Sequence, residues 1–400
     1  MTSRIPLIRR LFQIAIVVAV LVTGFRYAMG WSRTSIETYC PFGGLETALS
    51  LFTHKQFACA TGERNLALFV GLILLTVLSR RVFCSWICPV GSISEWIALF
   101  VSRLRGSRVL PRKALLSFAR RHPRLDVWLR WLRLPVLATI LYLTFRTGEL
   151  LFRGVDPYYI LFSFHGHDVQ YWSYIVLGVV LTGVILIPMA WCRYLCPLGA
   201  ALWPFSAVGG LRVVRDATAC TDCGRCDRVC LQNLTVSKAD SVRSGECTLC
   251  GDCLAECPQP GALSLTAFSS GFRPGTMVVP ILIVLITVGA LYGATVFAIP
   301  SVVVEYPPGP HPSGHVQTVV MIVDGVRCVD TAATAAMGLN DTPGVMRCEA
   351  FASHSRLEVT FDPQVTTPEA LRESIEGPIY DTETGNFLFN QFKVARIDNK

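Results

Sequence analysis

Eight cysteines in the middle of this chain follow one spacing that occurs twice. The spacing is Cys-x2-Cys-x2-Cys-x3-Cys, and its two copies are Cys220, Cys223, Cys226, Cys230 and Cys247, Cys250, Cys253, Cys257. Thiolates at this spacing let one short loop wrap an iron–sulfur cube of four irons. Two adjacent copies predict two cubes close enough to exchange electrons.

The second copy ends in Cys257-Pro258, as in the bacterial ferredoxins that carry two clusters, whereas Leu231 follows the first copy. In such ferredoxins the fourth cysteine of each run ligates the other cluster. This resemblance assigns two interleaved ligand sets: Cys220, Cys223, Cys226 and Cys257, and Cys247, Cys250, Cys253 and Cys230. A pair of structural zinc sites is the alternative, but such sites usually show two separated Cys-x2-Cys pairs.

A second repeat, Cys-x3-Cys-Pro-x-Gly, ends two apolar stretches. Its copies are Cys84-Ser-Trp-Ile-Cys88-Pro89-Val-Gly91 and Cys192-Arg-Tyr-Leu-Cys196-Pro197-Leu-Gly199. Cysteines at i and i+4 share one helix face, and the proline tends to end or restart the helix. Four thiols brought together could hold a third cluster, another metal or a redox-active dithiol pair. Packing of small buried residues is the alternative, and the spacing alone does not choose.

The elements that must position these cysteines are membrane helices. Hydrophobic residues make up 52% of the chain and charged residues only 16%, unlike a soluble protein. A span must cross about 30 Å of hydrocarbon, and five apolar stretches are long enough: 8–29, 65–83, 134–152, 171–191 and 275–299. We therefore expect a polytopic α-helical membrane domain.

Basic residues predict the orientation of these spans. They precede the first span and crowd the segment between the second and third, which places both on the cytoplasmic side. The N-terminus and the ferredoxin segment are then cytoplasmic, and the C-terminus is periplasmic, in a bacterial inner membrane. Free thiolates suit the reducing cytoplasm. The net charge of +8 then reflects orientation and lipid contact, not nucleic-acid binding.

Two segments of this membrane part leave alternatives open. The first span could be a signal peptide, but residues 27–30 form a poor cleavage site, which favours an uncleaved anchor. Segment 111–133 mixes arginine with leucine and tryptophan. It predicts either an amphipathic helix in the cytoplasmic interface or a solvated basic loop.

The C-terminal part, about 315–400, follows a proline-rich linker at 300–314 and predicts an α+β domain. The expected elements are a strand at 316–323, a helix at 329–339, a hairpin at 346–352 and 355–361, a helix at 367–375 and a strand at 392–397. Thr367 can cap the second helix. The order β-α-β-β-α-β is that of a ferredoxin-like sandwich.

Outside the cytoplasm, Cys40 and Cys59 flank a loop that contains His54, and Cys40 begins a further Cys-Pro-x-Gly sequence. This pair could form a disulfide, bind copper or act as a dithiol that receives electrons. His165 and His167 could ligate a metal or contact a quinol, although loop histidines are usually solvent-exposed. The five expected spans contain no histidine, so a haem relay is not predicted.

Twin Cys-x3-Cys-Pro motifs followed by a two-cluster ferredoxin segment resemble the membrane polyferredoxin family over about residues 60–270. Its members include the NapH, NosR and FixG/CcoG types, which serve nitrate reductase, nitrous-oxide reductase and copper reduction for oxidase assembly. The resemblance implies electron transfer through membrane-bound iron–sulfur centres, without fixing donor or acceptor. The chain differs from the NosR type, since no large flavin domain precedes the first span, and its C-terminus is unlike that of the FixG type.

The C-terminal part resembles a heavy-metal-associated domain, whose metal loop needs two thiolates at Cys-x2-Cys for a soft ion such as Cu(I). Here Cys328 holds the first position, but Thr331 replaces the second. Cys348 follows after a helix of roughly 16 Å, so it is not expected to complete the site. A docking or regulatory remnant of the fold is the favoured reading.

Together these observations predict five parts: a membrane domain at 1–210, a two-cluster ferredoxin domain at 211–268, a fifth span at 269–299, the linker and the C-terminal domain. The predicted function is electron transfer between a cytoplasmic donor or quinol pool and a membrane or periplasmic acceptor, including Cu(II) in cuproenzyme assembly. The alternatives are a relay subunit of a respiratory reductase and a metal-binding or transport accessory protein with redox-sensing clusters.

Overall fold

The computed structural model of the protein describes residues 5–31, 36–54, 62–104, 122–147, 151–164, 169–268, 272–275, 277–296, 299–307, 316–326, 329–380, 387–389 and 392–399. The chain forms two units. The first contains residues 1–32, 69–143 and 151–290, and the second contains residues 33–68, 144–150 and 291–400.

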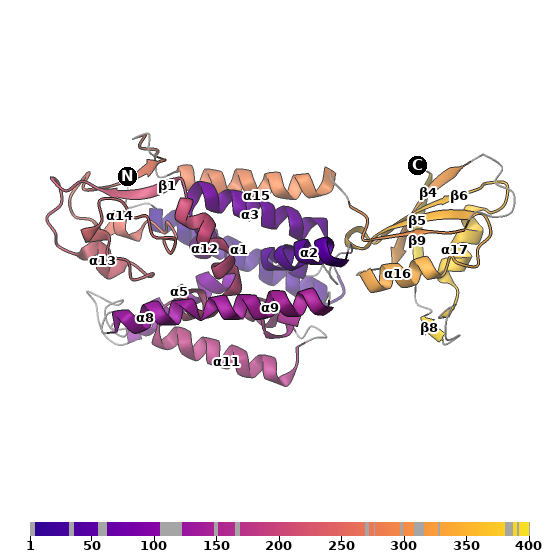
Figure 1. The fold of residues 1–400 in the computed structure, drawn as a ribbon, viewed down its shortest axis with the longest axis horizontal. Coiled ribbons are helices and arrows are strands. Elements are labelled where there is room, and N and C mark those ends of the chain that lie inside the picture. The colour runs from indigo at the N-terminus through magenta and orange to yellow at the C-terminus, as the bar shows by residue number, and fades with distance from the viewer. Residues whose placement is uncertain are drawn as a thin grey trace. The chain divides into compact units, whose positions relative to one another are not determined.

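Helices make up most of the first unit (Figure 1). In chain order they are α1 (Ile5–Ala28), α3 (Glu63–Ser79), α4 (Phe83–Trp86), α5 (Pro89–Leu104), α8 (Pro123–Trp131), α9 (Arg133–Thr147), α10 (Pro157–Phe162), α11 (Tyr171–Leu186), α12 (Pro197–Val208) and α15 (Val278–Val296). Each of the five apolar stretches overlaps one of these helices. Among the described helices, three stretches are long and apolar enough to cross a membrane: Ile5–Ala28, Pro123–Thr147 and Val278–Val296.

The helices of the first unit bury polar side chains and expose apolar ones. Arg9, Gln13 and Arg193 are fully buried, whereas Leu285 and Trp128 are 64% and 77% exposed. This distribution is the reverse of a soluble protein and is expected where lipid surrounds the helices. The chain is thus a membrane protein, and several of its charged residues, such as Arg9 and Arg193, are buried in its interior.

Helix α8 decides between the two interpretations of segment 111–133, an amphipathic helix or a solvated loop, for the described part of that segment. A solvated loop was one expectation, and it is wrong for the described part, because Pro123 begins a helix that reaches Trp131 and is followed after one residue by α9. Pro123 at the first helical position suits this start. Asp126 on α8 is buried while Trp128 is exposed, so the helix has a polar inner side.

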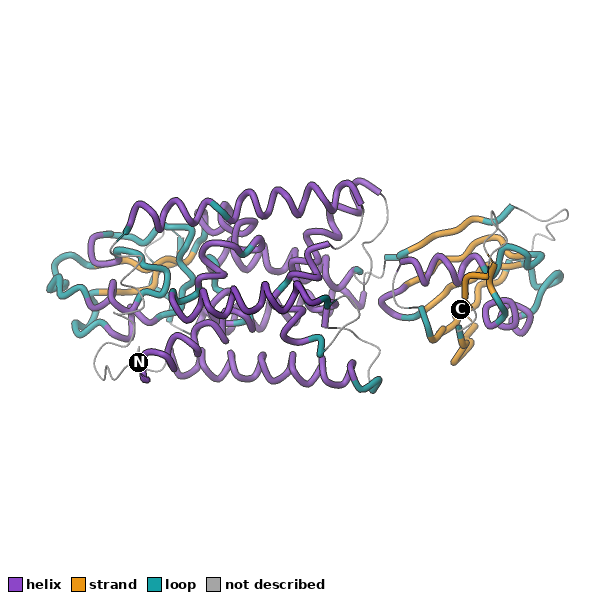
Figure 2. The backbone as a smooth tube through the Cα atoms, turned by 90° about the horizontal axis from the view of Figure 1, so that it is seen from below, coloured by secondary structure: helices purple, strands orange, loops and turns teal. Residues whose placement is uncertain are grey.

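The ferredoxin segment lies between α12 and α15 and is mostly loop (Figure 2). Strand β1 (Leu211–Arg215) pairs antiparallel with β2 (Leu263–Ala267), and the short helices α13 (Arg225–Val229) and α14 (Asp252–Glu256) lie between them in sequence. Its apolar core is continuous with the helices, because Leu249 and Leu265 pack in one cluster with Ile5, Trp86 and Val279. The segment is thus fixed to the membrane helices.

The second unit contains a five-stranded sheet in the order β3-β5-β6-β4-β9. Its elements are β3 (Val302–Glu305), β4 (Gln317–Asp324), α16 (Val329–Met337), β5 (Val345–Phe351), β6 (Arg356–Phe361), α17 (Pro368–Glu376) and β9 (Lys393–Asn399), besides β7 (Ile379–Tyr380), β8 (Phe387–Phe389) and α2 (Pro41–His54). All strand pairs in this sheet are antiparallel. The β-α-β-β-α-β order is confirmed, and Thr367 caps α17 by accepting a bond from the Ala370 N–H.

One expectation for this unit is wrong. The linker predicted at 300–314 contains β3, which pairs with β5 from Val302↔Ala350 to Glu305↔Arg347. The physical reason is that β5 would otherwise be an open edge with unpaired backbone groups. The buried core of the unit is built from residues of the C-terminal sheet and its two helices.

Candidate iron–sulfur and thiol sites

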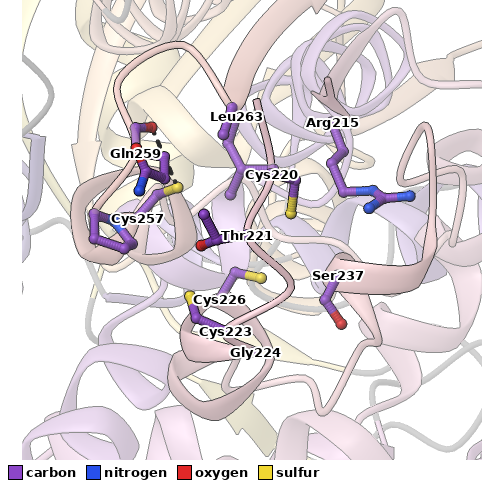
Figure 3. A pocket seen from close by; sticks show the side chains of 12 residues that line it. Arg215, Cys220, Thr221, Cys223, Gly224, Cys226, Ser237, Cys257, Gln259 and Leu263 are labelled. Atoms are coloured by element: carbon purple, nitrogen blue, oxygen red, sulfur yellow. Dashed lines mark hydrogen bonds between the residues drawn. The ribbon is translucent and has the colours of Figure 1, made fainter. Parts of the chain in front are cut away.

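Four cysteines line a pocket at the surface of the ferredoxin segment. They are Cys220, Cys223, Cys226 and Cys257, around about 350 Å³ of empty space that is partly open to solvent. Figure 3 shows their sulfur atoms around a common space, with Cys257 opposite the loop that carries the other three. Gly224 supplies the turn before α13 with a positive φ of 63°, a conformation that favours glycine. We call this the outer pocket.

Four further cysteines line a second pocket, the inner pocket: Cys230, Cys247, Cys250 and Cys253. It contains about 440 Å³ of empty space that is also partly open to solvent, and apolar side chains such as Leu231, Val242 and Leu249 line it. Gly251 repeats the role of Gly224, with a φ of 78° before α14. A Cβ at Gly251 would lie 2.7 Å from Cγ2 of Ile5 on α1, so glycine here also lets α1 approach the loop.

The fourth cysteine of each run lines the pocket of the other run. Cys230 follows α13 and Cys257 follows α14, and because these two helices pack together, each fourth cysteine reaches the opposite pocket. The two sets brought together are the same two that the sequence assigns to the two cubes. Their roles as ligands remain a prediction.

The chemistry of the two sets suits iron–sulfur clusters. Among the described residues, no three His, Cys, Asp or Glu side chains lie close enough to ligate one metal ion. A cube of four irons holds its thiolates farther apart than a single tetrahedral ion does. Burial raises the pKa of Cys226 to about 11 and that of Cys253 well above 9.0. These thiols must therefore lose protons when a metal cofactor binds.

The Cys-x3-Cys-Pro-x-Gly repeats each begin a helix. Pro89 begins α5 and Pro197 begins α12, as the sequence predicts from the prolines. The N–H of Gly91 donates to Cys88 Sγ at 3.5 Å, and the N–H of Gly199 donates to Cys196 Sγ at 3.4 Å. The second cysteine of each motif is thus a helix N-cap, and the positive end of a helix dipole faces its sulfur.

The structure brings the four motif cysteines together. Cys192 lies within electrostatic range of Cys88, Cys196 and Cys84. The fully buried Arg81 lies within range of three of them, and its Nη2 donates to the Cys192 carbonyl at 3.4 Å. A buried cation beside clustered sulfurs stabilises negative charge there, whether on thiolates or on a metal–sulfur group. We call this group the membrane thiol set.

The first motif is hydrogen-bonded to the loop of the inner pocket. The Arg81 N–H donates to the Cys247 carbonyl at 3.4 Å. Ser85 Oγ donates to the Thr248 carbonyl at 2.8 Å, and Trp86 Nε1 donates to the Leu249 carbonyl at 3.2 Å. Residues 81–86 therefore run directly along residues 247–249, so the inner pocket adjoins the membrane thiol set.

The second motif reaches the other side of the inner pocket. Arg193 and Arg130 both bind Asp126 on α8, and Arg130 Nη2 also donates to the Gln232 carbonyl at 2.9 Å. Gln232 lies two residues after Cys230 and contacts Met189 Sδ at 3.6 Å. Both motifs therefore flank the inner pocket, one beside Cys247 and one beside Cys230.

Buried ion pairs fix these contacts, and sequence reasoning missed them. Arg9 binds Glu95 at 2.7 Å and Asp252 at 3.1 Å, and Arg81 binds Glu246 at 2.6 Å. The sequence contained a sign of these ion pairs, because the acidic residues Glu246 and Asp252 stand beside predicted cysteine ligands. The sequence analysis used Arg9 only as a marker of orientation and did not consider Arg81.

The remaining candidates lie apart from these sites. Cys40 directly precedes Pro41, the first residue of α2, as Cys88 and Cys196 precede their prolines. Cys348 is fully buried in the core of the C-terminal sheet. The side chains of His54, Cys59, His165, His167 and Cys328 lie outside the described residues, so the predictions for them are unchanged.

Comparisons with known proteins agree with this arrangement. A family model described as "4Fe-4S binding domain" matches residues 61–108 and 169–209, which contain both Cys-x3-Cys-Pro motifs. A second, "4Fe-4S dicluster domain", matches residues 212–258. Neither extends over residues 315–400, and no solved structure matches the chain.

Several relatives each match somewhat more than half of the chain. YccM of Escherichia coli is 30% identical over 245 residues, which is 58% of this chain and 63% of YccM. An uncharacterised protein of Methanocaldococcus jannaschii, MJ0750, is 30% identical over 52% of this chain and 80% of its own length. The ferredoxin-type protein NapH of Escherichia coli is 25% identical over 56% of this chain and 76% of NapH.

These matches settle the nature of the cysteine runs as iron–sulfur motifs rather than zinc sites. They also agree with the buried charges and exposed apolar helices of the first unit. The chain therefore belongs to the family of 4Fe-4S ferredoxin-type membrane proteins that includes YccM and NapH.

Proposed function

We propose that the protein carries electrons from the cytoplasmic side into the membrane, through the outer pocket, the inner pocket and the membrane thiol set in that order. Bound four-iron clusters supply one-electron chemistry in the two pockets. Cys220, Cys223, Cys226 and Cys257 are the proposed ligands of the outer cluster, and Cys230, Cys247, Cys250 and Cys253 those of the inner cluster. The observation that carries the proposal is the set of hydrogen bonds between residues 81–86 and residues 247–249.

The order of the three centres is supported by their exposure. Cys223 is exposed, so a donor can approach the outer pocket. The inner pocket adjoins the core shared with α1, α3 and α15, and none of its four cysteines is exposed as Cys223 is. Cys84 and Cys192 are buried among the helices, which gives the proposed path its membrane step.

The proposed topology follows the basic residues: a cytoplasmic N-terminus retained as an anchor, five spans, and a periplasmic C-terminal domain. The acceptor is a quinone, an extracytoplasmic oxidoreductase or Cu(II). A relay subunit of a respiratory reductase would use the same path, whereas an accessory protein with redox-sensing clusters would need no rapid exchange with a partner.

The first test is the iron and acid-labile sulfide content of anaerobically purified protein. About eight irons per chain correspond to two cubes, and about twelve would mean that the membrane thiol set holds a third. Stoichiometric zinc with little iron would overturn the proposal.

The second step of this test replaces a thiol of the membrane set. Cys84→Ser and Cys196→Ser should stop electron throughput to an acceptor while the cysteines of both pockets keep their iron. Cys348→Ser, buried in the core of the C-terminal sheet, is the matched control and should leave throughput unchanged. Unchanged throughput in the first two variants would remove the membrane thiol set from the path.

A further inference from the structure

Arg80 stands at the junction of the inner pocket and the membrane helices. It is 1% exposed and follows the last residue of α3. Its backbone has a φ of 58°, in the left-handed region that costs a residue with a Cβ roughly 1 kcal/mol or more. Such a conformation persists only where surrounding contacts hold it.

Those contacts are three carbonyl oxygens from different parts of the chain. Arg80 Nε donates to Leu211 at 2.8 Å, and Nη1 donates to Ser206 at 3.2 Å and to Ser244 at 3.0 Å. Gly209 makes room for the side chain, because a Cβ there would lie 2.6 Å from Arg80 Cγ. The guanidinium thus joins the end of α12, the start of β1 and the loop before Cys247.

The charge of Arg80 lies close to a proposed ligand of the inner cluster. The Ser244 carbonyl that accepts from Arg80 also accepts from the Cys247 N–H at 3.1 Å. Among the described residues, Arg80 pairs with no carboxylate, unlike Arg9, Arg81 and Arg193. A full positive charge therefore remains buried beside Cys247.

Burial and the charge of Arg80 act in opposite directions on the reduction potential of a cluster in the inner pocket. A cluster gains negative charge on reduction, so an apolar surrounding disfavours reduction and a nearby buried cation favours it. The outer pocket has a different balance, since its arginine, Arg215, pairs with the exposed Asp222 at 3.3 Å and Asp240 at 3.5 Å. Solvent and these carboxylates weaken the effect of Arg215.

We propose that Arg80 is a positioning and tuning residue that raises the reduction potential of the inner cluster, so that electrons pass inward from the outer cluster. The proposal rests on the presence of both clusters. Without the charge of Arg80, the apolar wall of the inner pocket would make the inner cluster the harder one to reduce, and electrons would stay on the outer cluster.

The test is a potentiometric titration of the full-length, anaerobically purified protein, followed by electron paramagnetic resonance. A water-soluble lanthanide complex identifies the signal of the outer cluster, because it speeds the relaxation of an exposed centre more than that of a buried one. The signal whose relaxation the lanthanide complex changes less belongs to the inner cluster. In the unaltered protein, this signal should have the higher reduction potential. Arg80→Gln should move that signal to lower potential and leave the other in place.

Two variants control for structural damage. Arg80→Lys keeps the charge but loses the fork of hydrogen bonds, and its inner signal should stay near the original potential. Arg215→Gln should leave the inner signal unchanged. Equal shifts in Arg80→Gln and Arg80→Lys, or no shift in either while both signals are present, would overturn the inference. Absence of cluster signals from the unaltered protein would instead count against the proposed function.

Discussion

At the scale of single residues, glycine decides how closely the Cys-Pro-x-Gly turns can pack. A Cβ at Gly91 would lie 2.2 Å from the Cys84 carbonyl oxygen, and one at Gly199 would lie 2.5 Å from Nη2 of Arg81. The first contact is with backbone and the second with the end of a long side chain. The motif therefore needs glycine for space, besides its proline and cysteines.

This difference predicts that alanine destabilises the protein by different amounts at Gly91 and Gly199. Gly91→Ala should destabilise the protein by about 1–3 kcal/mol, the usual cost of overpacking, and Gly199→Ala by less, because its shortest contact is with a side-chain end rather than with backbone. Gly178→Ala on α11 has nothing within 4 Å of its Cβ and is the control. Thermal unfolding in detergent ranks the three variants by melting temperature, and iron content is a second readout. Equal melting temperatures for Gly91→Ala and Gly178→Ala would contradict it.

At the scale of elements, buried carboxylates attach the ferredoxin segment to the helices. Glu246 binds Arg81 and also Arg133 on α9. Burial opposes its charged form, but the two arginines outweigh this and hold the pKa of Glu246 below its ordinary 4.5. A lowered pKa in the folded state means that the stabilisation is complete above about pH 4.5 and is lost as pH falls through the folded pKa.

Removing this carboxylate should detach the inner pocket from the helices. Glu246→Gln leaves two buried arginines without their anion, and breaking such a pair costs about 3–5 kcal/mol. Asp240→Asn removes an exposed carboxylate that pairs at 3.5 Å and should cost less than about 1 kcal/mol. Unfolding at pH 7 compares the two, and the Glu246→Gln deficit should shrink towards pH 4. A deficit that is constant down to that pH would argue against the ion pairs as its cause.

At the scale of the whole molecule, the iron–sulfur part and the C-terminal sheet have separate cores. The core around the inner pocket is drawn from residues 5–286, and the core of the sheet from residues 302–397. The described residues that line the two pockets all lie between 213 and 263, so removal of the sheet should leave both cluster sites intact.

A chain cut after residue 299 and fused to alkaline phosphatase tests this separation and the proposed topology together. It should keep the iron content of the full-length protein and show phosphatase activity, because residue 299 is placed outside the cytoplasm. The same fusion after residue 268 should be inactive. Loss of iron from the longer fusion would show that the C-terminal part supports the clusters, and an inactive longer fusion would reverse the orientation.

Much of the architecture follows from local pattern. The apolar runs predict the helices. Pro89 and Pro197 predict the starts of α5 and α12. Alternation of apolar and polar residues predicts the strands of the C-terminal sheet. The resemblance to two-cluster ferredoxins assigns two interleaved sets, and the same sets line the two pockets because Cys230 follows α13, Cys257 follows α14 and these helices pack together. Segment 111–133 was left open between a helix and a loop, and strand β3 was missed, because the proline content of residues 300–314 hid an edge strand.

By itself, the sequence determined that this protein has two cube-binding loops and two helix-end thiol pairs in a membrane chain. Only the tertiary structure decided that both thiol pairs flank the inner pocket and that Arg80 lies beside Cys247, with no carboxylate partner in the part of the chain that the structure describes. The physical reason is that spacing fixes what neighbours in the chain can do together. Which buried charges meet depends on contacts between residues more than a hundred positions apart, such as Arg81 with Glu246.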